Sequence, residues 1–285
     1  MEQISRKPPL STLPLLLWLV FFLVVPCCLV LLLSFFRRGV YGGVVYDFTF
    51  DNYLRAFDFL YLRVAFNSVV MALVTAVSCA VIGFPMAYVM AVASKKVRAW
   101  LLLLVVIPFW TNFVVRAHAV KSILSDSGPI NQVWEFCMGL LGSAVTPLYL
   151  GDSLLSLWVG MVSTYLPFMV IPIYVVLEKF DFQLLEAARD LGAKPLDVLL
   201  RILLPLGASG IRTGFIFVFT PALGEFVIPD MLGGSKILMI GNVISDQFLK
   251  TRDWPFGSTI ALILIVAVLF SGYLFRKSGV MNATA

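Results

Sequence analysis

The sequence predicts an all-α membrane protein that crosses the bilayer six times. Hydrophobic residues make up 60% of its 285 residues and charged residues only 13%, which is too apolar for a soluble domain of this length. Uncharged stretches long enough to span a bilayer recur along the chain, separated by charged or turn-forming segments. They lie at Leu10–Phe36, Val64–Ser94, Ala99–Val115, Leu154–Leu177, Thr213–Gly224 and Trp254–Phe275.

The first stretch is expected to be a retained anchor. Arg6 and Lys7 precede it, as in a signal peptide, but it is too long for a signal-peptide core, and no small-residue cleavage site follows before Arg37. The segment after it is polar and aromatic, and we expect it outside the membrane. The chain then divides into an anchor with an external segment (1–63), a core of five spans (64–275) with a cytoplasmic loop at 178–205, and a cytoplasmic tail (276–285).

The second and third stretches contain residues that cap or interrupt a helix. Asn67 is expected to cap the second span, and Gly83 and Pro85 are expected to bend it. The third stretch ends in Ile107–Asn112 and, being short, is expected to continue past the nearest charge. Between the third and fourth spans we expect an external loop with a short helix at Gln132–Leu141.

Residues 186–205, EAARDLGAKPLDVLLRILLP, predict two short helices between the fourth and fifth spans. Gly192 is placed to end the first helix in a left-handed conformation, and Pro195 suits the first turn of the second. Asp197 lies at the positive end of that helix and can pair with Arg201. Each helix has an apolar stripe, formed by Leu184, Leu185, Ala188 and Leu191 in the first and by Leu196, Leu199, Leu200 and Leu203 in the second.

The fifth stretch is also short and has an uncharged lead-in from Ile202 that only Arg212 interrupts, so we expect it to extend toward that lead-in. Gly210 and Gly214 are four residues apart, a spacing that lets two helices approach closely. We expect a contact between two subunits to use it.

Basic residues predict that both termini face the cytoplasm. With the amino terminus inside, the inner side carries more Lys and Arg than the outer side, although Arg37 and Arg38 oppose this bias. The turn at residues 95–98, the charged segment at 186–205 and both termini then lie on one side.

The charged segment resembles the EAA loop of ABC-importer permeases, which docks in a cleft of the cytoplasmic ATPase. The pattern of Glu-Ala-Ala, three residues, Gly, nine residues and Ile-x-Leu-Pro is present without a gap. An ordinary interfacial amphipathic helix would explain the stripes but not this spacing. With six spans, the motif implies a type I ABC-importer permease fold, and the residues expected to couple to the ATPase are Glu186, Ala187, Ala188, Arg189, Asp190, Gly192 and Pro205.

Within that superfamily, the chain resembles the spermidine/putrescine (polyamine) permeases. The strings that carry this resemblance are Ile107–Asn112, Leu166–Val170, Glu186–Gly192, Gly224–Pro229, Ile240–Val243 and Arg252–Gly257. The resemblance implies polyamine import by alternating access across a bacterial inner membrane. It also implies a second permease, two ATPase subunits that hold ATP and Mg, and a periplasmic or lipoprotein substrate-binding protein.

The sequence contains no phosphate-binding Gly-x-x-x-x-Gly-Lys-Ser/Thr loop, so we expect no catalytic residue and no cofactor bound directly to this chain. The net charge of +5 comes without a basic face or a stacking motif, so we expect no nucleic-acid partner. Cys27, Cys28 and Cys79 fall in apolar runs and Cys137 stands alone, which predicts packing roles and no metal site.

A polycation needs aromatic faces and negative charge along its path. The candidate pathway residues are Trp110, Tyr165, Glu225, Asp230 and Asp253. A carboxylate at the position of Glu225 needs water, a cation or a basic partner, so an ion pair with Arg212 or Arg116 is the alternative to substrate contact. For Trp110, the alternative is a place in the aromatic belt.

Three other functions stay open from the sequence. Permeases for iron, sulfate, phosphonate or sugars share the coupling loop, and Arg116 and Arg212 would suit an anion. An intramembrane enzyme would need paired acids, a Ser–His pair or metal ligands, whereas the single histidine, His118, has no such partners. A channel or assembly factor would not need an ATPase-docking loop.

Overall fold

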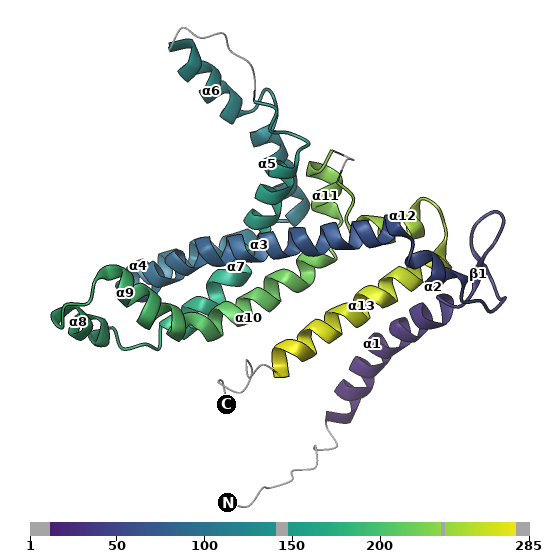
Figure 1. Ribbon diagram of the computed structural model, residues 1–285, viewed down its shortest axis with the longest axis horizontal. Coiled ribbons are helices and arrows are strands. Elements are labelled where there is room, and N and C mark those ends of the chain that lie inside the picture. Colours follow the sequence, from purple (N-terminus) through teal and green to yellow (C-terminus); the bar gives the residue numbers. More distant parts are fainter. Residues whose placement is uncertain (1–11, 141–147, 235–236, 278–285) are drawn as a thin grey trace, which may run out of the picture. The chain divides into compact units, whose positions relative to one another are not determined.

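The computed structural model describes residues 12–140, 148–234 and 237–277, most of which form helices (Figure 1). Helical segments long and apolar enough to cross a membrane lie at Leu13–Leu33, Phe59–Val92, Leu154–Leu177, Pro195–Leu223 and Trp254–Tyr273. A bent pair, Lys95–Trp110 with Phe113–Leu140, brings the number in the described part to six. This agrees with the six predicted spans. The expected start at Leu10, the helix end at Leu141 and the tail beyond residue 277 lie outside the described residues.

The contacts divide the described chain into two compact units, which contain residues 12–62 with 243–267 and residues 63–242 with 268–277. The grouping differs from the expected division at residue 63, because residues 243–267 join the amino-terminal unit. The physical reason is a set of long-range contacts. Arg55 forms an ion pair with Asp253, and the Thr259 hydroxyl donates to the Ser34 carbonyl oxygen.

The first unit contains a small hairpin that the sequence did not predict. Its elements are α1 (Leu13–Leu33), β1 (Arg37–Arg38), β2 (Val44–Val45) and α2 (Asp51–Ala56), with parts of α3 (Phe59–Val92), α12 (Ile240–Leu249) and α13 (Trp254–Lys277). The strands are antiparallel, with Arg37 opposite Val45. Gly42 and Gly43 make the turn with φ of +89° and +83°, a backbone conformation that glycine adopts without strain.

The ion pair between Arg55 and Asp253 joins α2 to the start of α13. The two charged groups are 2.8 Å apart, and the guanidinium lies 3.9 Å from the centre of the Phe256 ring. Burial acts to lower the pKa of Arg55, but hydrogen bonds with Asp253 and Tyr61 outweigh it, so the pKa is raised and the cation is kept. The other oxygen of Asp253 accepts the Phe256 N–H at 3.2 Å and so caps α13.

The second unit is a bundle in which α7 and α10 lie side by side (Figure 1). Its elements are most of α3, then α4 (Lys95–Trp110), α5 (Phe113–Leu124), α6 (Pro129–Leu140), α7 (Leu154–Leu177), α8 (Gln183–Asp190), α9 (Pro195–Val198), the π-helical turn η2 (Leu199–Leu203), α10 (Leu204–Leu223) and α11 (Val227–Leu232). Helix α6 corresponds to the short external helix that the sequence predicts.

Glycines on α10 make the close contact with α7. A Cβ atom on Gly210 would lie 2.7 Å from the Cα of Ile173, and one on Gly214 would lie 2.6 Å from the Met169 sulfur. Ile173 and Met169 are fully buried. The close approach predicted from the glycine spacing is therefore present, but its expected use between two subunits is wrong, because both helices belong to this chain.

One prediction about α3 is wrong. The helix begins at Phe59, so Asn67 lies in its interior and caps nothing. Gly83 and Pro85 lie within the continuous helix, and the bend expected there stays a prediction. A helix can extend beyond its uncharged run because long charged side chains such as Arg63 can reach the headgroup region. Ser68, which follows Asn67 in the chain, makes a specific contact where Asn67 makes no cap. The Ser68 hydroxyl accepts the Ile240 N–H at 2.7 Å.

The third and fifth spans both continue past the nearest charge, as predicted. The third begins at Lys95 and so includes Arg98, but at its other end the chain turns by 99° between α4 and the helical segment that follows. Asn112 caps α5 by accepting the Val114 N–H, and the Pro108 carbonyl oxygen accepts from Thr111 and Arg116. The fifth extends as expected, since α9, η2 and α10 form one helical segment over Pro195–Leu223.

We expect Gly210→Ala to destabilise the protein, because the added methyl group would press on the backbone of Ile173. Overpacking of this kind costs about 1–3 kcal/mol. The measurement is the melting temperature of the purified protein in detergent. Gly272→Ala is the matched control, since no atom lies within 4 Å of its Cβ position. Equal melting temperatures for the two variants would contradict the close packing of α7 and α10.

Candidate coupling hairpin and substrate pathway

Helices α8 and α9 form the hairpin that the sequence predicts, and we call residues 183–205 the coupling hairpin. Gly192 has φ of +86°, its N–H donates to the Arg189 carbonyl at 2.9 Å, and the Ala193 N–H donates to the Ala188 carbonyl at 3.0 Å. These two bonds define a Schellman motif, in which a left-handed residue satisfies the last carbonyls of a helix. The predicted turn at Gly192 is confirmed.

The second arm of the coupling hairpin continues into the membrane-spanning helix. Pro195 occupies the first turn of α9, and Asp197 pairs with Arg201 at 3.3 Å, both as predicted. The Leu204 N–H donates to the Leu199 carbonyl five residues back, which makes the wide turn of η2. Pro205, which has no N–H to donate, follows that turn at the start of α10. A displacement of the hairpin therefore acts directly on α10.

The hairpin presents both apolar and charged side chains to its surroundings. Leu185, Val198 and Leu203 are buried against the chain. Four other leucines of the stripes face outward, with exposed fractions of 57% for Leu184, 89% for Leu191, 66% for Leu196 and 53% for Leu200, while Leu199 is half-buried. Glu186, Ala187, Arg189, Asp190, Gly192 and Pro205 are exposed, and Ala188 is half-buried. An apolar patch among charges at the end of a helix bundle is typical of a protein-docking surface.

Tyr165 and Glu225 are brought together by α7 and the segment before α11. The Tyr165 hydroxyl donates to Oε2 of Glu225 at 2.6 Å. Oε1 of Glu225 accepts the N–H groups of the three following residues at 3.1, 2.9 and 3.4 Å. Four donors thus stabilise the negative charge without a basic partner. The alternative of an ion pair with Arg212 or Arg116 is wrong, since none of the ion pairs among the described residues includes Glu225.

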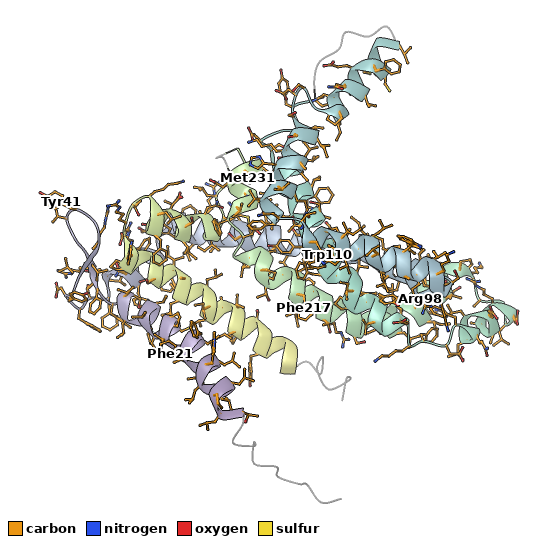
Figure 2. All side chains as sticks on the ribbon, turned by 180° about the vertical axis from the view of Figure 1, so that it is seen from behind. Phe21, Tyr41, Arg98, Trp110, Phe217 and Met231 are labelled. Carbon is orange, nitrogen blue, oxygen red and sulfur yellow. The ribbon has the colours of Figure 1, made fainter. Side chains whose placement is uncertain are left out.

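The other candidate pathway residues lie apart from this pair or have partners of their own. Trp110 is 81% exposed at the end of α4, next to the bend (Figure 2). Asp230 is exposed on α11. Asp253 belongs to the first unit, where its side chain is 1% exposed and paired with Arg55. The structure therefore gives Asp253 a structural role, and its contact with substrate stays a prediction.

Residues that the sequence did not single out position the Tyr165–Glu225 pair. Phe168 packs against Tyr165 and also against Phe109 at the end of α4, with ring centres 6.2 and 4.9 Å apart. Phe109 and Phe168 lie in two of the strings that carry the family resemblance, Ile107–Asn112 and Leu166–Val170. Those strings were the sequence signal that could have identified both rings. Other side chains hold α11 through its carbonyls: Ser156 donates to Leu232, Lys121 to Met231 and Asn242 to Phe226. Bonds to backbone carbonyls leave no pattern in a sequence.

A cavity of about 480 Å³ lies between α3, α4 and α7. Its lining includes Met90, Leu101, Val105 and Pro167 and contains no charged residue. Burying an ammonium group there would be unfavourable without a partner, so this cavity does not suit a polycation.

Spanning helices joined by an exposed charged hairpin define a multi-pass membrane permease. Residues 80–277 match the family described as the binding-protein-dependent transport system inner membrane component, and the chain belongs to that family. A structure of a bacterial alginate ABC transporter, in complex with an alginate pentasaccharide-bound periplasmic protein, has a chain with the same fold. Its TM-score is 0.70 at 20% identity, covering 94% of this chain and 93% of that one. The predicted permease fold is confirmed.

Two of the relatives from Escherichia coli strain K12 are named for spermidine/putrescine transport. The spermidine/putrescine transport system permease protein PotB is 42% identical over 267 residues, which is 93% of this chain and 95% of that protein. The permease protein PotC of the spermidine/putrescine transport system is 32% identical over 114 residues, which is 40% of this chain and 43% of that protein. Both are named as permeases, in agreement with the prediction of a transporter subunit rather than an enzyme.

We expect Gly192→Ala to loosen the coupling hairpin, because an L residue with a Cβ is strained at positive φ. The left-handed conformation costs about 1 kcal/mol more for alanine, so amide hydrogen exchange in residues 186–200 should quicken roughly fivefold. Gly192→Asn is the control, since asparagine visits this conformation readily. Unchanged exchange in the alanine variant would show that the turn is not strained.

We expect Tyr165→Phe to weaken the attachment of α11, because Glu225 would lose its hydroxyl donor. Hydrogen bonds to a charged group contribute about 1.5–3 kcal/mol, so the melting temperature should fall. Tyr273→Phe is the control, since Tyr273 is 62% exposed on α13. A melting temperature that matches this control would mean that the bond contributes little.

Proposed function

We propose that this chain is a permease subunit of an ATP-driven importer and that its substrate is a polyamine. The substrate class rests on the 42% identity to the E. coli spermidine/putrescine permease over 93% of the chain. It is also supported by the chemistry of the Tyr165–Glu225 pair, which offers a half-buried carboxylate beside aromatic rings. Such a group suits an ammonium ion rather than an anion.

The observation that carries ATP-driven coupling is the continuity of the coupling hairpin with the fifth span. One helical segment runs from Pro195 to Leu223, so a force on the exposed hairpin reaches the middle of the bundle. In the proposed cycle, ATP closes two ATPase subunits and brings the hairpins of two permeases together. The spanning helices then rock and open the pathway outward, and hydrolysis resets them.

The proposed assembly contains a second permease, two ATPases and a substrate-binding protein. The second permease is expected to be a paralogue, since the chain also matches part of PotC, a second permease named for the same transport system. ATP and Mg belong to the ATPases, which would dock on the exposed leucines and on Glu186 and Arg189. The family description names a binding protein, which would deliver the substrate from outside.

The proposed orientation places the coupling hairpin and both termini in the cytoplasm of a bacterium, with the bundle in its inner membrane. The turn at residues 95–98 and the end of α7 meet through an ion pair between Arg98 and Glu178. Lys and Arg residues gather at this common end, and the cytoplasmic side of a membrane is enriched in such residues.

In the proposed pathway, an ammonium group of the substrate competes with the Tyr165 hydroxyl for Oε2 of Glu225. Asp230 and Trp110 would attract the polycation nearer the outside. A sulfate or phosphonate carrier with the same fold is the second candidate, for which Arg116 and Arg212 were the supporting residues. The support from Arg116 is weaker, because Arg116 donates to the Pro108 carbonyl at 2.6 Å and stabilises the bend.

We expect Glu225→Gln to lower ATP-dependent uptake of labelled putrescine and spermidine, because the amide has no charge to attract an ammonium group. A lost charge-assisted contact corresponds to roughly a tenfold change in rate. The measurement is uptake into proteoliposomes with the complete complex, and co-purification of the ATPase reports assembly. Glu135→Gln on α6 is the control, since Glu135 is exposed.

Wild-type uptake in the Glu225→Gln variant would remove Glu225 from the pathway. Labelled sulfate tests the substrate class in the same vesicles. ATP-dependent uptake of sulfate but not of polyamines would overturn the proposed substrate, and failure to bind any ATPase would overturn the coupling role of the hairpin.

A further inference from the structure

Arg98 joins three helix ends at the base of the coupling hairpin. It lies in the first turn of α4, at the end of the bundle from which the hairpin extends (Figures 1 and 2). Its Nη1 atom is 3.0 Å from Oε1 of Glu178, which is the residue that caps the carboxyl end of α7. Its Nη2 atom donates to the Ala91 carbonyl at 2.7 Å, in the last turn of α3.

Glu178 is the last fixed point of α7 before the coupling hairpin. Its N–H donates to the Tyr174 carbonyl and continues the helix, and five residues later α8 begins at Gln183. A movement of the hairpin therefore displaces Glu178 before any other residue of α7. Through Arg98, the same movement acts on α4 and on the end of α3.

Burial makes this ion pair stronger than a typical surface pair. The side chains of Arg98 and Glu178 are 25% and 41% exposed, whereas Arg201 in the pair at Asp197 is 81% exposed. Water screens a half-buried pair less. The Nε atom of Arg98 is buried and has no hydrogen-bond partner in the described part of the chain, so Glu178 and Ala91 together satisfy only part of the guanidinium.

Aromatic rings make a second contact between the hairpin and α3. Phe182, which directly precedes α8, lies 6.2 Å from the Tyr88 ring on α3 and 5.5 Å from Phe180. These rings keep the start of the hairpin beside α3 but have no directional bond to α4. Among the described residues at this junction, the Arg98 guanidinium alone links α3, α4 and α7 in one group of polar bonds.

We propose that Arg98 is a positioning residue that transmits movement of the coupling hairpin to α3 and α4. The inference rests on the proposed function and adds a second route of coupling. The first route is covalent and runs from α9 through η2 into α10. The second runs through Glu178 and Arg98 and makes α3 and α4 follow the hairpin, so that the bundle moves as a unit.

The geometry requires arginine rather than lysine. Two separate Nη atoms reach Glu178 and Ala91 in different directions, whereas a lysine ammonium is a single point on a flexible chain. Lysine at this position keeps the charge but cannot make both bonds with fixed geometry. The charge is thus less important than the simultaneous attachment to two helices.

The test compares Arg98→Gln, Arg98→Lys, Glu178→Gln and the charge swap Arg98→Glu with Glu178→Arg. Each variant is assembled with its ATPases, second permease and binding protein in proteoliposomes. The readouts are ATPase co-purification, ATP hydrolysis and labelled putrescine uptake. Lys96→Gln is the matched control, since Lys96 is exposed in the same helical turn.

We expect the single variants to keep the ATPase bound and to hydrolyse ATP, while substrate transported per ATP falls. Coupling residues change the coupling free energy by 0.5–2 kcal/mol, so the ratio should fall roughly twofold to thirtyfold. The charge swap should recover part of the ratio, and the Lys96 control should keep it. A role in folding alone would lower assembly and leave the transport ratio of the assembled complexes unchanged.

An unchanged transport ratio in both Arg98→Gln and Glu178→Gln would overturn the role of Arg98. Failure of the wild-type chain to bind an ATPase, or to transport in response to ATP, would instead overturn the proposed function. The two failures are distinguishable because the second appears in the wild type.

Discussion

A chain that enters a bilayer must satisfy its own backbone hydrogen bonds, and the irregular points of this protein are built around that requirement. Where α4 ends, the Pro108 carbonyl accepts from Thr111 and Arg116, and Asn112 caps the helix that follows. Around α11, side chains from other parts of the second unit bind the carbonyls. A break in a spanning helix is stable here because polar side chains replace the missing helical bonds.

The same requirement gives Glu225 two roles. Its Oε1 atom accepts the free N–H groups at the start of α11, which would otherwise lack partners. Among the described residues, its Oε2 atom accepts only the Tyr165 hydroxyl, the bond for which a substrate ammonium group competes in the proposed pathway. One carboxylate thus stabilises the backbone and, in the proposed pathway, would also bind the substrate.

The proposed coupling depends on stiffness at the hairpin and on close packing in the bundle. The Schellman turn at Gly192 and the continuous helix beyond it leave little flexible backbone between the exposed leucines and α10. Gly210 and Gly214 place α10 directly against α7, so movement of one helix displaces the other. The Arg98 contacts would extend this connection to α3 and α4.

Local patterns in the sequence determined the six apolar segments and the turn of the coupling hairpin. Hydropathy and the left-handed preference of Gly192 act over a few residues, so they hold whatever surrounds them. Asn67 was misread for the same reason, since the uncharged run that placed a helix start there does not mark where α3 begins. The β1–β2 hairpin was missed because its two-residue strands leave almost no pattern.

Only the tertiary structure decided the partners of the polar residues. Tyr165 and Glu225 are 60 residues apart, and Arg55 and Asp253 are 198 apart, so no local spacing relates them. The sequence contained the carboxylates and the arginines but could not pair them, because pairing depends on which helices pack together. Packing likewise decided that Gly210 and Gly214 contact a helix of the same chain, since a small-residue spacing permits close approach without specifying the neighbour.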